Sequence, residues 1–408
     1  MNTSLSERIA KGLQMMKRTL LLVFVLSLTV NVFGGMPDRK KARIDSLVNE
    51  NRMLNAKIDA LASQVQALSL YVKELQSSIS VNIEGLQSSI NELANAQSSK
   101  NVLSGVCGEN VHWNLNTDTG VLEIIGSGDM VDFADENQVP WHDYASSIFT
   151  LLLSDGITHI GDYAFCKCTG LKQPTIPTSV TSIGNHSFES CTKLEPIIPN
   201  SVTTIGKCAF KGCALTSFVI PSSVKVISIG MFANSSITSI SIPSGVTTIA
   251  ASAFSGCKLL EQITLPSGVT TIGAYAFYGC ESLARVIIPT GVRSIDEGTF
   301  AECKSLKHIT LPSGIKYIGE QAFTHSGLEE IIIPEGVTKI DWQAFEECTS
   351  LKKASLPSSL RELQMAAFRN CKNLTNANVP RGVKMNAWPF DGTPLGTKFR
   401  RLYPHPAL

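Results

Sequence analysis

A period of 22 or 23 residues constrains the fold of this chain more than any other feature. Phenylalanine recurs at positions 165, 188, 210, 232, 254, 277, 300, 323, 345, 368 and 390, and proline at 177, 199, 221, 243, 266, 289, 312, 334, 357 and 380. Each proline precedes the next phenylalanine by eleven residues, or by ten in the last unit, so length changes are confined to one half of the unit. Such a period predicts a solenoid, because one unit has a single apolar layer and buries it only by stacking on its neighbours.

The unit from Leu260 to Cys280 shows how one repeat is expected to fold. Its first part, L-x-x-I-x-L-P, predicts an extended strand that ends at the proline, where the missing N–H is tolerated. The following V-x-x-I-G is expected to turn the chain, and the A-F pair to fill the coil. The pattern therefore predicts a mainly β solenoid of about ten repeats over residues 154–393.

Eight of the eleven cysteines lie three residues after the periodic phenylalanine, at Cys168, Cys191, Cys213, Cys257, Cys280, Cys303, Cys348 and Cys371. Ser235 and Ser326 occupy the same position in two further repeats. Metal sites favour closely spaced cysteine pairs, and the ladder has none. The position is predicted to hold buried free thiols at a tight turn, whereas Cys107, Cys166 and Cys208 lie off this ladder.

The repeat and its lead-in resemble the BspA-type leucine-rich repeats of bacterial surface proteins, over roughly residues 104–393. The lead-in runs from Cys107 through Trp113 and Met130 to Pro140-Trp141. Its own pattern predicts a β-hairpin that turns at Asp118-Thr119-Gly120 and forms an N-terminal cap, residues 101–153. The resemblance implies a leucine-rich-repeat solenoid in an exported protein, with adhesion or host-matrix binding as the expected role.

A heptad pattern precedes the repeats and predicts a coiled-coil stalk within residues 38–100. The a positions include Asn51, Ile58, Val65 and Val72, and the d positions include Leu54, Leu61, Leu68 and Leu75. β-Branched residues at a with leucine at d favour a parallel dimer, and a lone asparagine at a fixes register. A single amphipathic helix packed on the solenoid, or a trimer, stays open as an alternative.

The N-terminal segment, residues 1–37, has the pattern of a targeting sequence. Lys17 and Arg18 precede an apolar run over 20–33, which as a helix reaches about 21 Å, short of the ~30 Å hydrocarbon core. This favours a signal peptide, although an uncleaved signal anchor in the inner membrane stays open. Export to the cell surface, the outer envelope or the medium is the expectation. Residues 394–408 are expected to form a short C-terminal tail.

Charge and motif content argue against nucleic-acid binding and catalysis. Lys plus Arg number 35 against 34 for Asp plus Glu, which leaves no basic excess for nucleic acid. The seven histidines show no metal-ligand spacing, and no nucleophile, base and orienting group can be placed together. We therefore expect no enzyme, cofactor or metal. The four tryptophans, Trp113, Trp141, Trp342 and Trp388, are expected in the core or the caps rather than in a sugar platform.

If the protein binds a ligand, the outward residues of the L-x-x-I-x-L strands form the expected face. Strand alternation predicts two outward rows. The central candidates are Gln262, Arg285, Ile287, His308, Thr310, Glu330, Ile332 and Lys353. The favoured function is protein or matrix binding by an exported, non-catalytic surface protein, with a ligand of unknown identity. The alternative is a structural envelope or spacer protein, whose sheet face is merely solvated.

Overall fold

The structure is a computed structural model that describes residues 101–216 and 218–397, together with a few positions between 43 and 59. Contacts divide the chain into two compact units, Met1–Ser99 and Lys100–Leu408. Leu54 and Ile58 are helical. The other named stalk residues (Asn51, Leu61, Val65, Leu68, Val72 and Leu75) and the segment 1–37 lie outside the described residues, so the coiled coil and the signal sequence stay predictions. Among the described residues, no helix combines the length and apolar character that crossing a membrane requires.

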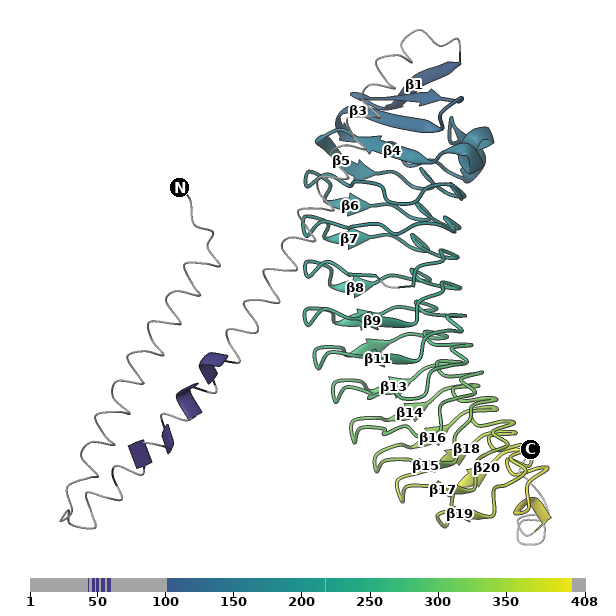
Figure 1. The fold of residues 1–408 in the computed structure, drawn as a ribbon. Coiled ribbons are helices and arrows are strands. Elements are labelled where there is room, and N and C mark those ends of the chain that lie inside the picture. Colours follow the sequence, from purple (N-terminus) through teal and green to yellow (C-terminus); the bar gives the residue numbers. More distant parts are fainter. Residues whose placement is uncertain are drawn as a thin grey trace, which may run out of the picture. The chain divides into compact units, whose positions relative to one another are not determined.

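The repeats form a stack of similar coils, as the period predicts (Figure 1). Each coil adds one short strand to the first of two parallel ladders, and either a short strand or an isolated bridge to the second. Ladder 1 consists of β5 (Gly156–Ile160), β6 (Ser182–Ile183), β7 (Thr204–Ile205), β8 (Val226–Ile227), β10 (Thr248–Ile249), β12 (Thr271–Ile272), β13 (Ser294–Ile295), β14 (Tyr317–Ile318), β16 (Lys339–Ile340), β18 (Glu362–Leu363) and β20 (Lys384–Met385). Ladder 2 contains β4 (Thr150–Leu153), β9 (Ser239–Ser241), β11 (Gln262–Thr264), β15 (Glu330–Ile332), β17 (Lys353–Ser355) and β19 (Asn376–Asn378), with isolated bridges in the coils between them.

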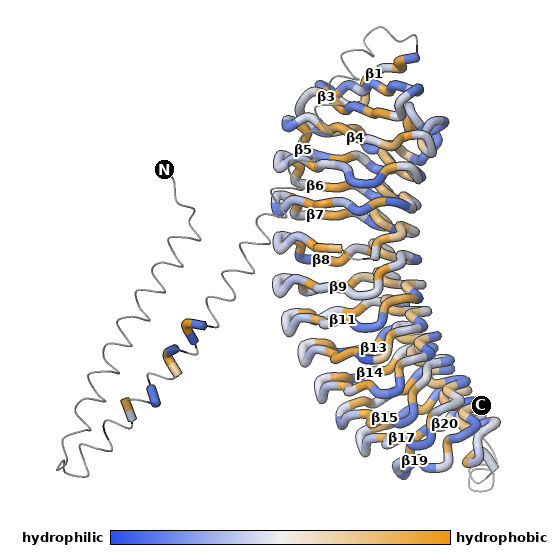
Figure 2. Tube along the Cα trace, viewed as in Figure 1, coloured by the Kyte–Doolittle hydropathy of each residue, from blue (hydrophilic) through white to orange (hydrophobic). Residues whose placement is uncertain are grey.

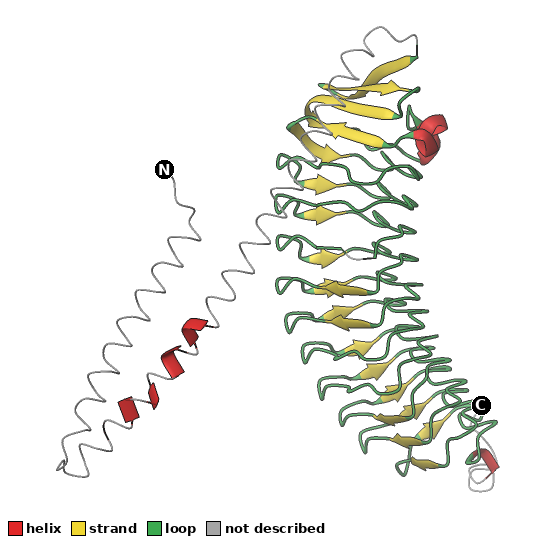
Figure 3. Ribbon diagram, viewed as in Figure 1, coloured by secondary structure: helices red, strands yellow, loops and turns green. Residues whose placement is uncertain are grey.

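The turn within each coil lies earlier than expected. Val269 N–H donates to the Pro266 carbonyl at 3.0 Å, and the equivalent bond recurs in eight other coils, in two of which Ile315 or Leu360 is the donor. The turn is therefore P-x-x-V, and V-x-x-I, which was predicted to turn, instead leads into the strand of ladder 1. The prediction failed because P-x-x-V already closes the turn, which frees the next residues to pair with neighbouring coils. Figure 3 shows the resulting short strands joined by long loops.

The periodic phenylalanines form one continuous stack along the core. Rings from Phe165 to Phe390 follow one another at centroid distances of 4.9 to 6.1 Å, and all are buried. Figure 2 shows the apolar positions recurring at the same place in successive coils. Apolar burial of this kind contributes about 1.5–3 kcal/mol per large side chain. The predicted role of the phenylalanines is confirmed.

Two residues per coil have left-handed backbone conformations. They lie two positions before and two positions after each phenylalanine. Seventeen positive-φ residues of the described coils are not glycine, and all of them except Ala387 occupy these two positions. The Phe277 N–H between two such residues donates to the Thr299 carbonyl of the next coil at 3.0 Å, and each earlier coil repeats this bond. These inter-coil hydrogen bonds form a third ladder. They hold the backbone in a conformation that L-residues normally avoid.

The cysteine ladder is buried, as predicted. The Cys213 thiol donates to the Phe188 carbonyl at 3.0 Å, and six other ladder cysteines make the same bond to the preceding coil. All eleven cysteines are free thiols. Ser235 and Ser326 fill the two serine rungs, where each hydroxyl lies 3.2–3.3 Å from the next thiol. The position thus requires a small side chain that can donate one hydrogen bond.

The N-terminal cap is larger than the predicted hairpin. β1 (Val102–Gly108), β2 (Val111–Asn116) and β3 (Val121–Asp129) form an antiparallel sheet, and β2 and β3 are joined at the predicted turn. β3 then pairs in parallel with β4 and with β5, so it covers the first strand of both ladders. Two 3₁₀ helices, η1 (Glu136–Gln138) and η2 (His142–Ser147), follow β3.

Two of the four tryptophans occupy the cap core, as expected. Trp141 is buried, stacks on Phe165 at 6.2 Å and donates its indole N–H to the Ala164 carbonyl at 2.7 Å. Trp113 packs edge-on against Trp141 at 5.5 Å. Trp342 is 47 % exposed and Trp388 is 36 % exposed, so the core assignment is wrong for these two. Trp342 stands three residues before a stacked phenylalanine, a position that points outward in other coils too.

Candidate ligand-binding face

The outward side chains of ladder 2 form two parallel rows. In β9, β11 and β15 the outer two residues are exposed and the middle one is buried. The first row contains Gln173, Glu195, Ser239, Gln262, Arg285, His308, Glu330, Lys353 and Asn376. The second contains Thr175, Ile197, Val219, Ser241, Thr264, Ile287, Thr310, Ile332, Ser355 and Asn378. We call the first the polar row and the second the aliphatic row.

The structure brings the sequence-predicted residues together as neighbours across the coils. Gln262 bridges to Arg285, and Ile287 bridges to Thr310. Strands β15 and β17 pair Glu330 with Lys353 and Ile332 with Ser355. His308 is exposed between them. Ladder strands lie about 4.8 Å apart, so these side chains form an evenly spaced array.

The aliphatic row carries the most exposed large apolar residues of the described coils. Ile197 is 82 % exposed, Val219 83 %, Ile287 61 % and Ile332 69 %. Side chains at these positions point away from the core because their neighbours Ile198, Phe218 and their equivalents point into it. A row of isolated exposed aliphatic residues on a regular sheet is apolar surface held in place by backbone hydrogen bonds. Contiguous exposed apolar patches mark interaction surfaces, and among the described coils this row comes nearest to such a patch.

Sequence reasoning missed Ile197 and Glu195. The stretch from Leu194 to Pro199 is one residue shorter than its neighbours, so counting two and four residues from the leucine does not find its outward positions, and neither predicted row includes this repeat. Thr175 bridges to Ile197, which places Ile197 in the aliphatic row. Gln173 donates to the Glu195 carboxylate at 3.3 Å, which places Glu195 in the polar row. Counting backwards from the proline identifies both.

Charged residues beside the polar row are paired with one another. The Glu329 carboxylate lies 3.1 Å from the Lys352 ammonium and 3.6 Å from that of Lys307. The hydrogen bond from Lys352 lowers the pKa of Glu329. Exposed pairs of this kind contribute little to stability. Together Glu329, Lys307 and Lys352 leave one net positive charge beside the polar row, in which Arg285, Glu330 and Lys353 are the charged residues.

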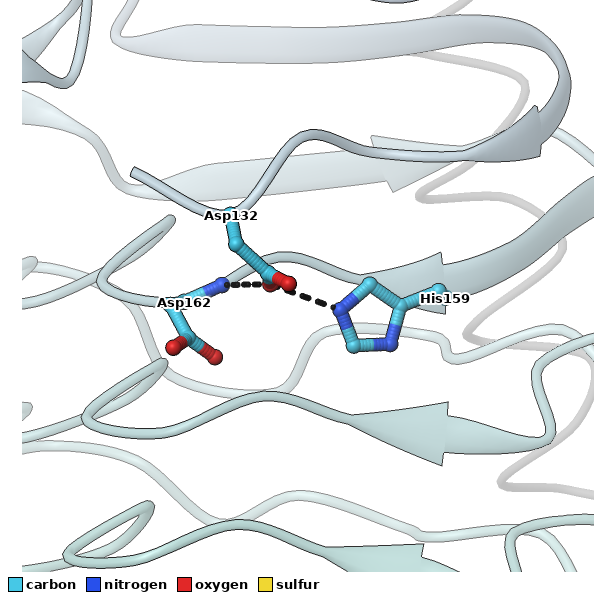
Figure 4. A group of neighbouring side chains, drawn as sticks. All are labelled: Asp132, His159 and Asp162. Atoms are coloured by element: carbon cyan, nitrogen blue, oxygen red, sulfur yellow. Dashed lines mark hydrogen bonds and ion pairs between the residues drawn. The ribbon is translucent and has the colours of Figure 1, made fainter. Parts of the chain in front are cut away.

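A second cluster lies where the cap meets the first coil (Figure 4). Ligand-type atoms of Asp132, His159 and Asp162 lie within 4.8 Å of one another. Asp132 Oδ1 accepts from the Asp162 N–H at 2.9 Å and contacts His159 Nε2 at 3.0 Å. Partial burial opposes ionisation of Asp132, but the hydrogen bonds from His159 and Asp162 outweigh it and lower the pKa. The sequence showed no metal-ligand spacing here because the residues meet only across the cap boundary.

This cluster continues as a ladder of side-chain-to-backbone hydrogen bonds. Asp162 accepts from the Asn185 N–H at 2.5 Å, and Asn185 accepts from the Lys207 N–H at 2.8 Å. Each carboxylate or amide therefore satisfies the backbone of the next coil. A cation at Asp132 and Asp162 would compete with these bonds, so the arrangement is accounted for as a structural joint between cap and coils.

The buried thiols of Cys213 and Cys257 are poor nucleophiles. Burial raises the pKa of Cys213 to about 12 and that of Cys257 to about 11. The reactive form of cysteine is the thiolate, which these environments disfavour. Among the described residues, the Cys ladder therefore has a packing role.

The match to known proteins covers the coils. The family model described as the BspA type leucine-rich repeat region matches residues 144–198, 195–301 and 270–395 in six copies. A leucine-rich repeat protein from Eubacterium ventriosum is 23% identical, with a TM-score of 0.50, covering 72% of this chain and 95% of that one. One from Bacteroides ovatus is 26% identical, with a TM-score of 0.48 and coverage of 70% and 91%. A leucine rich cell surface protein from Faecalibacterium prausnitzii is 26% identical, with a TM-score of 0.41 and coverage of 69% and 96%. The search of curated proteins gave no match.

Proposed function

Since the chain belongs to the BspA type leucine-rich repeat family, whose model matches more than half of it, we propose that it is an exported, non-catalytic surface protein that binds a protein ligand. The binding surface is the outward face of ladder 2. One observation carries the proposal, namely the exposed aliphatic row that runs beside the polar row on a rigid sheet. A face that contacts only solvent would not require isoleucine at positions 287 and 332, because threonine and serine occupy the equivalent positions in neighbouring coils.

The contrast with ladder 1 supports the choice of face. Outward positions in ladder 1 strands are mainly Ser, Thr and charged residues, and Val226, 43 % exposed, is the one aliphatic side chain among its described outward positions. Protein interfaces combine an apolar centre with a polar rim. Ladder 2 offers this arrangement, with Ile287 and Ile332 beside Arg285, His308, Glu330 and Lys353.

Binding of the purified full chain to an array of extracellular-matrix proteins tests this function. The double variant Ile287→Asp/Ile332→Asp should weaken binding to a hit by at least about tenfold, since a buried apolar contact becomes a buried unpaired charge. Val226→Asp on ladder 1 is the matched control and should bind as the native chain does. Equal loss in both variants, or no binding to any array protein, would favour the spacer alternative.

The location is part of the proposal and rests on the basic and apolar N-terminal sequence. External protease added to intact cells should digest residues 100–408. Recovery of the full-length, shielded chain in the cytosol would contradict export.

The heptads support a parallel dimer that presents two faces together. Two weak faces on one stalk raise apparent affinity by about 10²–10⁴-fold when the target admits both. Sedimentation equilibrium of the full chain checks the dimer, and a monomer at micromolar concentration would contradict it.

A further inference from the structure

The cap presents an open strand edge. β1 pairs with β2, and no other strand of the described chain pairs with β1. Near the end of β1, the Val131 N–H donates to the Cys107 carbonyl at 2.8 Å, so the open edge covers residues 102–106. Natural edge strands are usually protected by charges, proline or a covering segment. The β1 sequence, VLSGVCG, contains neither a charged residue nor a proline. Val102 is 44 % exposed, Leu103 38 % and Val106 61 %.

Hydrogen-bond alternation fixes which backbone groups of β1 face outward. The Thr117 N–H donates to the Asn101 carbonyl at 3.0 Å, so residue 101 points toward β2. Neighbouring residues of an antiparallel strand point alternately toward and away from the partner. The N–H and C=O groups of Val102, Ser104 and Val106 therefore point to the open side.

We propose that this edge pairs with the β1 edge of a second copy of the chain, antiparallel and centred on Ser104. In this register Val102 lies opposite Val106 of the other copy, and Ser104 lies opposite Ser104. The outward N–H and C=O groups then form about six hydrogen bonds. No charge meets a like charge, because the strand has none.

The inner face of β1 is self-complementary in the same register. Leu103 lies opposite Gly105 of the second copy. The indole of Trp113 lies directly beside Gly105, within 2.8–3.3 Å of where a Cβ would stand. A large side chain on one copy thus meets a position without a side chain on the other, next to an aromatic ring. Any register shifted by one residue would bring inward and outward side chains into opposition.

The proposal does not rest on the ligand-binding function. The heptad segment ends a few residues before β1 in the sequence. A dimeric stalk would raise the local concentration of the two edges, whereas the pairing itself uses only residues 102–106.

Disulfide trapping of the full chain tests the pairing. Paired residues of this type have Cα atoms about 5.5 Å apart, within the range a disulfide spans. Ser104→Cys should form a covalent dimer under mild oxidation. The matched control, Glu109→Cys, lies on the β1–β2 turn about 17 Å from the centre, so its two copies are about 34 Å apart. We expect Ser104→Cys to cross-link at least about tenfold faster than Glu109→Cys, because docking gives it a high effective concentration.

A second substitution tests whether cross-linking requires pairing of the two β1 edges or only the proximity that a dimeric stalk would give them. Val106→Lys in the Ser104→Cys background places a charge on the otherwise uncharged edge strand, a device that protects natural edges from pairing, and should lower cross-linking to the level of Glu109→Cys. Thr119→Lys in the same background places the same charge on the β2–β3 turn and should leave the rate unchanged. Equal rates for Ser104→Cys and Glu109→Cys would overturn the proposal, as would equal effects of the two lysines.

Discussion

Every strand of the cap and of the coils is paired, but the two regions differ in the length of their strands and in the direction in which the strands pair. In the cap, β1, β2 and β3 are seven, six and nine residues long and antiparallel. In the coils, ladder strands mostly span two or three residues and pair only with the same position of the next repeat. The coils are therefore stabilised by many short parallel strand pairs, and the cap by a few long antiparallel ones.

Positive-φ residues sharpen this difference. The positive-φ residues of the described cap are all glycine: Gly120, Gly126 and Gly128. A side chain at Gly126 would collide with the Asn110 carbonyl, so glycine is required there. In the coils seventeen non-glycine residues adopt positive φ. The coils tolerate this because inter-coil hydrogen bonds on either side of each phenylalanine impose the conformation, which a single-copy cap cannot provide.

The largest effect is expected in the phenylalanine stack. Phe277→Ala should destabilise the protein by about 3–5 kcal/mol, because it leaves a cavity between the rings of Phe254 and Phe300. Urea denaturation followed by circular dichroism measures the loss. Leu259→Ala, at a position 51 % exposed, is the control and should change stability by less than about 0.5 kcal/mol. Similar losses in both variants would show that the stack is not the main support of the coils.

The joint between cap and coils is the next target. Trp141→Phe keeps an aromatic ring but removes the N–H that donates to the Ala164 carbonyl. An unsatisfied buried carbonyl costs about 1–3 kcal/mol. Hydrogen exchange should accelerate in β1–β3 and stay unchanged near Phe277, since the cap opens first. Trp342→Phe, at an exposed site, is the matched control. Uniform acceleration along the chain would mean that cap and coils unfold as one unit.

Sequence predicted the coils better than the cap for a physical reason. Every coil repeats the same contacts. The spacing of Phe, Pro and Cys therefore predicts which residues form the phenylalanine stack, the outward rows and the buried thiol ladder. The turn was misplaced because P-x-x-V closes it earlier, and V-x-x-I instead leads into the strand of ladder 1. Ile197 was missed through a one-residue deletion. Asp132, His159 and Asp162 meet only across the cap boundary, where no period exists to align them.

Alkaline pH should destabilise the coils more than the cap, because the coils contain ten of the eleven thiols and the cap contains only Cys107. Burial raises the pKa of Cys213 from 9.0 to about 12. Below pH 9 the thiol is protonated in both folded and unfolded chains, so it adds no pH dependence. Between pH 9 and 12 only the unfolded chain releases the proton, so stability falls as pH rises. At pH 10 this loss is about 1.4 kcal/mol for one such thiol.

Cys213→Ser tests this because serine already occupies two rungs of the ladder. The variant should lose less stability between pH 8 and pH 10 than the native chain, by about 1.4 kcal/mol in urea denaturation. Cys208→Ser, at a half-buried thiol, should show a smaller change. An identical pH dependence in the native chain and Cys213→Ser would mean that the thiol is not protected from ionisation.

The smallest expected effect isolates the backbone conformation itself. Gly279 has φ 66°, and a Cβ there would meet only the Gly256 backbone at 3.8–3.9 Å, an ordinary contact. Gly279→Ala therefore adds no clash, and its cost of about 1 kcal/mol comes from the left-handed conformation alone. Gly268→Ala, in the P-x-x-V turn of the same repeat, meets no atom closer than 3.5 Å and is the control. It should be neutral or slightly stabilising, by up to about 1 kcal/mol, through the unfolded chain. If Gly279→Ala is equally neutral, the inter-coil hydrogen bonds fully offset the conformational cost, and the seventeen non-glycine residues of the coils carry no strain at all.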